Sequence, residues 1–454
     1  MKPISAQQLA EILGASIAAG RGDALISSGV STDTRTLAAG AAFFALSGEN
    51  FDGDAFAVQA LEKGAAVVVV GKWLCESPVN AAVILVQNPL DALQRLARWW
   101  RDQLDIPVVA ITGSNGKTST KDFTAAVLAK KFKVSATRGN LNNHIGVPLT
   151  ILATTTEHRA AVWELGMNHP GEIAPLCEMA RPKYGIITNI GSAHIEFFGE
   201  RRGIAEEKGM LARALPLDGA LVIPATDDFH DYLCQQTAAP CIEVGGDRSP
   251  LRAENLRLDA EGASFRLVID GADPVDVSLP VTGRHMVVNA LLAAAVGWKL
   301  GISPEEMADA LSSTILTSGR LGRYECRGMT VIDDTYNANP ESMTAAIEAL
   351  VEAPVAAGSR RIIVLGHMGE LGAHAPMAHL QVGALAAERR LTVIAVGEGA
   401  EGIAKGAGDA PYFSDSSEAA AWLARETKAG DIVLFKGSRS AKIERVMHAA
   451  FPQN

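Results

Sequence analysis

The sequence lacks closely spaced cysteines. Its 454 residues include five cysteines, an odd number, and they are widely scattered without any C-x-x-C pair: Cys75, Cys177, Cys234, Cys241 and Cys326. This pattern fits neither a disulfide framework nor a zinc site. We therefore expect reduced thiols and a cytoplasmic protein.

Long apolar runs and an excess of positive charge are also missing. No stretch approaches the roughly 18 apolar residues of a membrane-spanning helix, and the N-terminal MKPISAQQLAEILGASI predicts a short amphipathic helix rather than a signal peptide. Lys and Arg total 41 against 51 Asp and Glu, so the net charge is −10. A nucleic-acid partner, which needs a basic surface, is not expected. We expect neither export nor a transmembrane segment.

The chain is longer than one hydrophobic core usually serves, and its pattern predicts three α/β domains. Residues 1–85 hold short β-rich runs around one helical stretch. In residues 86–316, apolar strands that end near Gly, Asn or Pro alternate with helical sequence, which is typical of a parallel sheet covered by helices. A β-rich patch at 263–283 precedes a long apolar helix. Residues 317–454 repeat the strand and helix alternation, which predicts a Rossmann-like C-terminal domain.

The stretch IPVVAITGSNGKT, residues 106–118, predicts a strand, a phosphate loop and the start of a helix. Gly113 and Gly116 let several backbone N–H groups converge on phosphate oxygens at a helix N-terminus. The loop is shorter than the common G-x-x-x-x-G-K-[ST] form, because Ile111 stands where the first glycine is expected. A simple glycine turn is the alternative, which the flanking strand and helix disfavour. The predicted nucleotide site comprises Gly113, Ser114, Asn115, Gly116, Lys117, Thr118 and Ser119.

Two side chains follow strands of the same predicted sheet. Glu164 ends AAVWE, and His194 follows IITNIGSA, so both could reach a cation at the phosphate loop. Mg²⁺ prefers oxygen ligands, which makes Glu164 the stronger candidate. The alternatives are a solvated carboxylate for Glu164 and a hydrogen-bonded structural histidine for His194. Lys208 lies on a helical stretch soon after, and by itself predicts a surface lysine.

The C-terminal third offers two polar clusters after strands. DDTYNANP, residues 333–340, could hold a nucleoside by stacking and hydrogen bonding, or it could be a polar loop before a helix. KGSRS, residues 436–440, suits a carboxylate or phosphate, or could be a solvated basic turn.

A dinucleotide-like glycine pattern also occurs late in the chain. Gly397, Gly399 and Gly402 have G-x-G-x-x-G spacing after a strand, with Asp415 and Glu418 near the expected acidic position. Glycine-rich strand exits are common in α/β proteins, and the phosphate loop already accounts for a nucleotide. We therefore disfavour a nicotinamide site here.

Read in order, nine motifs resemble the signature series of the Mur ligases, ATP-dependent amide-forming enzymes of peptidoglycan precursor synthesis. The resemblance covers nearly the whole chain, and the shared order is more specific than any one motif. The short phosphate loop is also found in the related folylpolyglutamate synthetases. The motifs are TGSNGKTST, GNLNNHIGVP, ELGMN, NIGSAHIEFFG, the Lys208 segment, TGRHMVVNALLAAA, GRLGRYE, DDTYNANPESM and KGSRS.

The resemblance implies a role for each matching residue. Lys117 and the loop amides would hold the ATP phosphates, while Thr118 and Glu164 would bind one Mg²⁺. His194 would bind a second Mg²⁺ together with Lys208, which in the family is often carbamylated. The nucleoside and phosphates would be contacted by Asn289, Arg320, Asp334, Tyr336 and Asn337.

The substrate side follows from the same resemblance. STDTRTLAAGAAFFALSGENFDG is similar to a uridine-diphosphate-binding domain, and the missing D-N-P-R motif together with DDTYNANPESM resembles members that add D-alanyl-D-alanine to a UDP-N-acetylmuramoyl-tripeptide. Third-residue-adding members and folylpolyglutamate synthetases are the nearest alternatives, and a regulatory protein that lost ligation is a non-enzyme alternative. We expect a monomer. The predicted substrate-binding residues are Ser31, Asp33, Arg35, Ser47, Asn142 and Asn143, with Lys436 and Arg439 near the incoming dipeptide.

Overall fold

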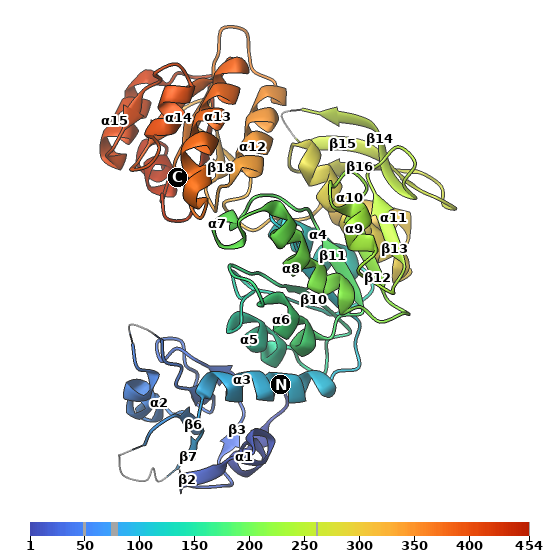
Figure 1. Cartoon of the computed structure of the whole chain (residues 1–454), viewed down its shortest axis with the longest axis vertical. Helices are drawn as coiled ribbons and strands as arrows, with labels where there is room; N and C mark the ends of the chain where they lie inside the picture. The colour runs from blue at the N-terminus through green and yellow to red at the C-terminus, as the bar shows by residue number, and fades with distance from the viewer. Residues whose placement is uncertain (49–50, 74–79, 260–261, 454) are drawn as a thin grey trace. The chain divides into compact units, whose positions relative to one another are not determined.

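The computed structural model describes residues 1–48, 51–73, 80–259 and 262–453. The chain forms two compact units (Figure 1). The first comprises Met1–Ala110, Phe132–Met167 and Gly171–Lys183, and the second comprises Ile111–Lys131, Asn168–Pro170 and Tyr184–Asn454. Cys75 lies outside the described residues.

The N-terminal part of the first unit is a five-stranded sheet with the order β2-β7-β6-β5-β4. Only the β2–β7 pair is antiparallel. The inner strands are buried and rich in Val and Phe, which suits a sheet covered on both faces. The elements are β2 (Ser16–Gly20), β4 (Val30–Ser31), β5 (Ala42–Phe44), η1 (Gly53–Phe56), α2 (Ala57–Glu62), β6 (Val67–Val70) and β7 (Ala82–Leu85).

The first helix is shorter than the sequence predicts. α1 (Ala6–Leu13) begins in a capping box made by Ser5 and Gln8. It ends at Gly14, whose φ of 60° places it in the left-handed region that glycine adopts without strain. The next residues enter β2, so the prediction that the helix continues through GASI is wrong.

The rest of the first unit packs around one long amphipathic helix, α3 (Pro89–Asp102). Its Trp100 is fully buried and donates its indole N–H to the carbonyl of Thr154 at 2.7 Å. β9 and β10 pair in parallel beyond it. The remaining elements are β1 (Ile4–Ser5), β3 (Leu25–Ile26), β8 (Val108–Thr112, which leads into the second unit), β9 (Val134–Ala136), α5 (Gly146–Ala153), β10 (Ala160–Glu164) and α6 (Ile173–Ala180).

The second unit contains parallel strands with an antiparallel extension. The strand order is β16-β15-β14-β13-β12-β11, in which β11 to β14 are parallel and the pairs β14–β15 and β15–β16 are antiparallel. The β-rich patch predicted from the sequence is therefore confirmed. The strands are β11 (Tyr184–Ile187), β12 (Ala220–Pro224), β13 (Cys241–Val244), β14 (Leu251–Leu258), β15 (Ala263–Ile269) and β16 (Val275–Leu279).

Helices α4 and α10 pack closely in this part of the second unit. A side chain at Gly297 would lie 2.5 Å from Val127 of α4, so the two helices meet through a glycine. α10 is buried along most of its length, as its apolar sequence predicts. The helices are α4 (Lys117–Ala129), α7 (Ile195–Phe198), α8 (Arg201–Arg213), α9 (His230–Cys234), α10 (Arg284–Lys299) and α11 (Pro304–Ser312).

The C-terminal part of the second unit is a six-stranded sheet with the order β17-β18-β22-β19-β20-β21. All pairs except β17–β18 are parallel, which confirms the predicted α/β class. The elements are β17 (Gly322–Cys326), β18 (Met329–Asp334), α12 (Pro340–Glu352), β19 (Arg361–Leu365), η2 (Gly372–His374), α13 (Ala375–Glu388), β20 (Thr392–Val396), α14 (Glu401–Gly406), β21 (Tyr412–Phe413), α15 (Ser416–Glu426), β22 (Ile432–Lys436) and α16 (Glu444–Ala450).

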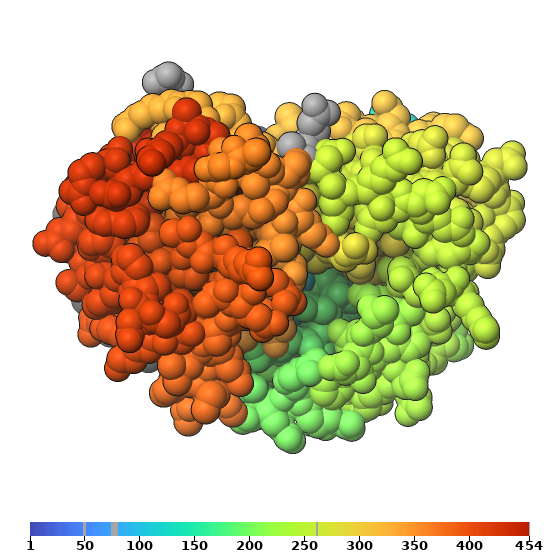
Figure 2. Space-filling model, turned by 90° about the horizontal axis from the view of Figure 1, so that it is seen from above, coloured from blue at the N-terminus to red at the C-terminus, as the bar shows by residue number. Residues whose placement is uncertain are grey.

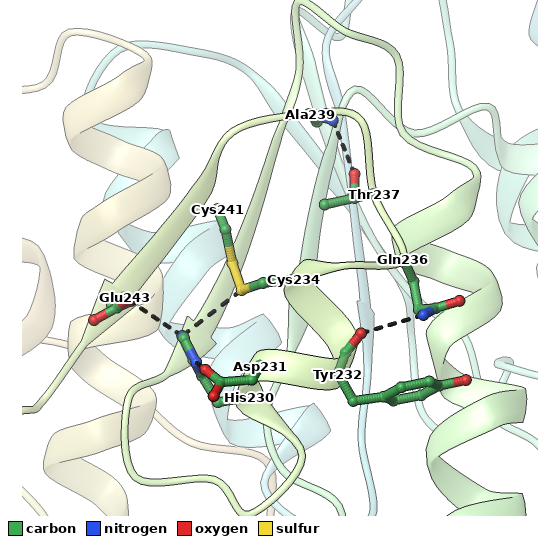
Figure 3. Close-up of a disulfide and its surroundings, with 9 residues drawn as sticks. All are labelled: His230, Asp231, Tyr232, Cys234, Gln236, Thr237, Ala239, Cys241 and Glu243. Atoms are coloured by element: carbon green, nitrogen blue, oxygen red, sulfur yellow. Dashed lines mark hydrogen bonds and ion pairs between the residues drawn. A yellow bond between two sulfur atoms is a disulfide. The ribbon is translucent and has the colours of Figure 1, made fainter.

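A disulfide joins Cys234 at the end of α9 to Cys241 at the start of β13 (Figure 3). The expectation that the scattered cysteines form no pair is therefore wrong at this position. Six residues separate the two cysteines in the sequence, and a turn between helix and strand brings their sulfurs together. Cys177 and Cys326 are free thiols.

Within the described residues, no helix is long and apolar enough to cross a membrane.

Truncating Phe451 to Ala should destabilise the C-terminal sheet by about 3 to 5 kcal/mol, because a buried aromatic ring leaves a cavity. Phe451 is fully buried, lies edge-on to Phe435 and accepts a hydrogen bond from Tyr324 through its carbonyl. Urea unfolding followed by tryptophan fluorescence measures the change. Ile315→Ala, at a side chain that is 93% exposed, is the control and should shift stability by less than about 0.5 kcal/mol. Equal midpoints for the two variants would contradict the packing described.

Candidate active site

The loop after β8 is pressed against neighbouring backbone and side chains of the second unit. A Cβ on Gly113 would lie 1.8 Å from the hydroxyl of Thr188, at the end of β11, and a Cβ on Gly116 would lie 2.7 Å from the amide oxygen of Asn289. Gly116 has a φ of 77° and immediately precedes α4. Neither position has room for a side chain. The strand, loop and helix predicted from the sequence are confirmed.

Hydrogen bonds to neighbouring residues fix the centre of the loop. Asn189 accepts from the backbone N–H of Ser114 through its carbonyl and from that of Asn115 through its side chain, at 3.0 and 2.8 Å. Ser114 accepts in turn from the N–H of Gly191. The amide of Asn339, more than 200 residues later, donates to the side chain of Asn115 at 2.8 Å. The loop and the segment before α12 therefore form one hydrogen-bonded cluster.

Two cations lie at the first turn of α4. Lys117 donates its ammonium to the carbonyl oxygen of Gly113 at 2.7 Å, so its charge lies over the loop. Arg320 donates to the hydroxyl of Thr118 at 2.9 Å, and its guanidinium stacks 4.2 Å from the ring centre of Tyr336. Positive charge at a helix N-terminus with converging N–H groups favours an anion, as the sequence predicts.

Figure 2 shows C-terminal residues, in orange and red, beside the green to yellow residues of the same unit. One strong connection between these parts was missed from the sequence. Glu341, in the first turn of α12, accepts from the backbone N–H and the hydroxyl of Ser192, both at 2.9 Å. The acidic residue after N-P in DDTYNANPE is the signal that could have indicated it, because carboxylates are common in a first helical turn. Glu341 thereby positions the segment that leads to His194.

Lys208 lies inside the protein, so the surface position predicted from helical sequence alone is wrong. Its side chain is 1% exposed on α8. Burial lowers the pKa of the Lys208 ammonium well below its ordinary value, and the charge of Lys117 lowers it further, while Glu207 raises it. The structure thus places a lysine that readily becomes a neutral amine in the electrostatic range of the phosphate-loop lysine.

His194 lies at the start of α7 with a left-handed backbone, at a φ of 66°. Its ring Nδ1 lies 2.5 Å from a carboxylate oxygen of Glu370, on the segment before η2. This contact lowers the pKa of the Glu370 carboxyl, mainly through the hydrogen bond from the imidazole. Glu370 is a second residue that sequence reasoning did not identify.

Asp334 and Lys436 form a buried ion pair at the ends of adjacent strands β18 and β22. The ammonium donates to the carboxylate at 2.6 Å and to the carbonyl of Asn337 at 3.0 Å. The alternative of a solvated basic turn is therefore wrong for Lys436, whose side chain is 4% exposed. Arg439 lies apart from this pair, on the surface, beside Glu444.

In the first unit, Glu164 ends β10 and is 3% exposed, so the solvated carboxylate alternative is wrong. The carboxylate of Glu164 accepts a hydrogen bond from the side-chain amide of Asn142 at 2.8 Å, and the backbone N–H of Glu164 donates to the hydroxyl of Thr137. Asn143 accepts from the N–H groups of Ile145 and Gly146 and so caps the start of α5. Asn142 and Asn143 thus have different partners although they are adjacent.

The residues predicted to contact uridine diphosphate lie in two turns of the first unit. Ser31 hydrogen-bonds the backbone of Asp33, and Asp33 holds the Arg35 guanidinium through both carboxylate oxygens. Hydrogen bonds from Arg35 lower the pKa of the Asp33 carboxyl to about 2. Ser47 accepts from the N–H of Gly53 and donates to Asp52. The Arg35 side chain is largely exposed and available to an anionic group.

The glycine pattern at 397–402 does follow a strand and precede a helix. Its helix α14 has only six residues, and a Cβ on Gly402 would lie 2.9 Å from His379 of α13. Asp415, the acidic residue a dinucleotide site would use, caps α15 by accepting from Ser417 and Glu418. These contacts give the glycines and the acid structural roles and leave the nicotinamide reading unsupported.

Comparison with known proteins identifies the class. Three family models match successive segments: the Mur ligase family catalytic domain at residues 27–101, the Mur ligase middle domain at 111–297, and the Mur ligase glutamate ligase domain at 319–439. The chain belongs to the Mur ligase family, as its motifs predict.

Relatives within that family are similar over their full length. The UDP-N-acetylmuramoyl-tripeptide–D-alanyl-D-alanine ligase of Escherichia coli K12 is 36% identical, with 99% of this chain and 98% of the relative covered. A crystal structure of MurF from Acinetobacter baumannii is 32% identical with a TM-score of 0.91, and both chains are covered completely.

A structure of MurF ligase from Thermotoga maritima in complex with ADP is 29% identical, with a TM-score of 0.81 and 93% of this chain and 96% of that chain covered. These matches confirm the three-domain α/β architecture. The boundaries at 85/86 and 316/317 stay predictions.

His285, at the start of α10, should stay neutral in the folded protein at mildly acidic pH. Burial lowers its pKa from 6.5 to about 4; Asp334 raises the value and Lys436 lowers it. Between pH 4 and pH 6.5 the unfolded chain therefore binds more protons at this histidine than the folded chain does. Its contribution to the free energy of unfolding is complete above about pH 6.5 and falls as the pH drops toward 4.

An NMR titration of ring-labelled histidines measures this pKa, with the His285→Gln variant used to assign the resonance. We expect a midpoint near 4. A midpoint at or above the ordinary value of about 6.5 would show that the ring is solvated rather than buried.

Proposed function

We propose that this chain joins D-alanyl-D-alanine to UDP-N-acetylmuramoyl-tripeptide with cleavage of ATP to ADP and phosphate, in peptidoglycan precursor synthesis. Full-length similarity to ligases with that name carries the proposal. The hydrogen-bonded phosphate loop, the two cations at α4 and the similarity to a MurF structure that holds ADP support the use of ATP.

The chemistry requires that a carboxylate be activated, because an amine does not displace oxide from a carboxylate. The terminal carboxylate oxygen of the tripeptide attacks the γ-phosphorus of ATP, ADP leaves, and an acyl phosphate forms. The amine of D-alanyl-D-alanine then attacks the carbonyl carbon, phosphate leaves and the amine loses its proton. An α-amine has a pKa of about 7.7 to 8.0, so a useful fraction is already neutral near pH 7.

The first step brings two anions together, and the side chains at the loop offset their repulsion. Loop N–H groups and Lys117 would hold the phosphates, and Arg320 would stabilise the charge on the transferred group. The stacking of Arg320 on Tyr336 and its bond to Thr118 keep the guanidinium at the first turn of α4. Asn289, which lies against Gly116, would contact adenine, with Tyr336 and Asn337 beside the nucleoside and Asp334 near the phosphates and ribose.

The substrate roles of the other predicted residues are proposed on the same basis. Ser31, Asp33, Arg35 and Ser47 would bind the uridine diphosphate group, for which Arg35 offers an exposed cation. Asn142 and Asn143 would face the muramoyl group. Lys436 and Arg439 would lie near the dipeptide, with Lys436 acting through the strand end that it ties to Asp334.

Magnesium is the proposed metal. Thr118 and Glu164 would offer the oxygen donors that Mg²⁺ prefers, and His194 and Lys208 are the other proposed ligands. Two magnesium ions would neutralise part of the negative charge on the phosphates.

Lys208 fits this set best as a carbamate. A buried ammonium within the field of Lys117 is unfavourable, because burial and the neighbouring positive charge both lower its pKa. The neutral amine adds to carbon dioxide and loses a proton, which gives an anionic carboxylate-like group. That anion would be attracted to Lys117 and to a cation. The proposal thus accounts for a buried lysine beside another lysine.

Release of phosphate should require ATP, UDP-N-acetylmuramoyl-tripeptide and D-alanyl-D-alanine together. Acceptors to compare are D-alanyl-D-alanine, diaminopimelate, lysine and glutamate, with product mass as a second readout. A preference for diaminopimelate or lysine would indicate a third-residue-adding ligase, and a preference for glutamate a folylpolyglutamate synthetase-like enzyme. No turnover with any acceptor would indicate a regulatory protein of this fold.

Lys117→Ala should lower turnover by about 10²-fold or more, because a charged donor to the transferred phosphate is lost. Lys405→Ala, at an exposed position on α14, is the matched control and should keep full activity. Substantial ligation by Lys117→Ala would contradict the role of the loop.

Lys208→Ala should lose most activity and regain part of it with a short carboxylic acid or bicarbonate, which can enter the space of the carbamate. The same additives should leave Lys117→Ala inactive. Full activity of Lys208→Ala without additives would remove Lys208 from the site.

A further inference from the structure

A cluster of soft metal donors lies where α9 meets β13, and the ligase reaction proposed above does not use it. His230, Cys234 and Cys241 each place one donor atom within 4.8 Å of the others. All three are partly buried. His230 and Cys234 are four residues apart and share one face of α9, whereas Cys241 belongs to the neighbouring strand.

The orientation of the histidine ring is set by its neighbours (Figure 3). Nδ1 of His230 lies 3.0 Å from a carboxylate oxygen of Asp231. In the tautomer that donates from Nδ1 to Asp231, the lone pair of Nε2 can bind a metal, and Nε2 faces Cys234 at 3.7 Å and Glu243 at 3.5 Å. A carboxylate that orients a histidine from its far nitrogen is the usual support of a metal-bound imidazole.

The donor separations suit a tetrahedral zinc ion. With Zn–S near 2.3 Å and Zn–N near 2.0 Å, neighbouring ligand atoms lie about 3.5 to 3.8 Å apart. The His230–Cys234 and His230–Glu243 separations already match this spacing. Cys241 and Glu243 alternate by two along β13 and therefore project from the same face. The carboxylate of Glu243 approaches the imidazole but is not within 4.8 Å of all three donors, so it has to shift to join them. The two sulfurs, joined in the disulfide, have to separate.

We propose that, after reduction of the Cys234–Cys241 disulfide, His230, Cys234, Cys241 and Glu243 bind one zinc ion. Reduction by a small thiol consumes two thiol molecules: their sulfurs join in a new disulfide, and the two protein sulfurs gain the protons. Zinc binding then displaces those two protons and leaves two thiolate ligands. Two thiolates with an imidazole favour zinc over magnesium or calcium, which prefer oxygen. Disulfide and zinc site are thus alternative states of the same residues.

The site would hold α9 against β13 in either state. α9 is itself tied to α8, because Arg202 stacks on Tyr232 at 3.9 Å and Arg213 donates to Gln236, which follows α9, at 2.6 Å. The turn between the cysteines is closed by hydrogen bonds from Gln236 to Tyr232 and from Ala239 to Thr237. These contacts keep the two cysteines in place when the disulfide is reduced and before zinc binds.

The test incubates the full-length chain with zinc chloride, either oxidised or after treatment with a thiol reductant that is then removed under anaerobic conditions, and measures the zinc retained. The reduced protein should retain about one zinc per chain through dialysis, and the oxidised protein none. Cys241→Ser and His230→Gln should lose zinc, while Cys326→Ser, which changes a free cysteine outside the cluster, should retain it. Circular dichroism checks that each variant is folded.

Cobalt(II) is a second probe that does not depend on any variant. The reduced wild-type chain should show thiolate-to-cobalt charge-transfer absorption and a tetrahedral visible spectrum, both of which zinc displaces. A reduced, folded chain that binds neither metal, or Cys326→Ser protein that loses the zinc, would overturn the proposal. Neither readout uses ligation activity, so failure of the proposed function would leave this result unaffected.

Discussion

The close packing of the phosphate loop on its neighbours is the constraint on which the rest of the candidate site depends. Gly113 has no room for a side chain beside Thr188, and Gly116 has none beside Asn289. Because the backbone approaches so closely, its N–H groups can converge at the start of α4. The same packing brings Asn289 of α10 to Gly116 of the loop, where we propose that it contacts the nucleotide.

The second unit completes this loop with residues from its C-terminal segment. Asn339 reaches Asn115, Arg320 reaches Thr118, and Glu341 holds Ser192. A ligase of this kind has to hold two anions together while charge moves from one to the other. Cations at a helix N-terminus offset that repulsion only if their positions are fixed, and the stacking of Arg320 on Tyr336 restricts its guanidinium.

The sequence predicted the elements whose pattern is local and missed contacts that only tertiary structure creates. The strand, loop and helix around Gly113, the parallel strands and the antiparallel patch were all predictable from apolar runs and glycines. β14 was not, because the alternating polar sequence LRAENLRL carries little apolar signal. Glu341 and Glu370 act on partners 149 or more residues away, and Cys234 meets Cys241 only because a turn folds α9 back on β13. The burial of Lys208 likewise depends on packing that helical sequence does not specify.

Oxygen-isotope transfer tests most directly whether this site activates a carboxylate with ATP. The tripeptide is labelled with ¹⁸O in both oxygens of its terminal carboxylate, and the phosphate released during ligation is examined by mass spectrometry. If the carboxylate attacks the γ-phosphorus, each phosphate released should carry one ¹⁸O, and the other should remain in the new amide carbonyl. Phosphate without ¹⁸O, formed at the same rate as the amide product, would contradict activation through an acyl phosphate.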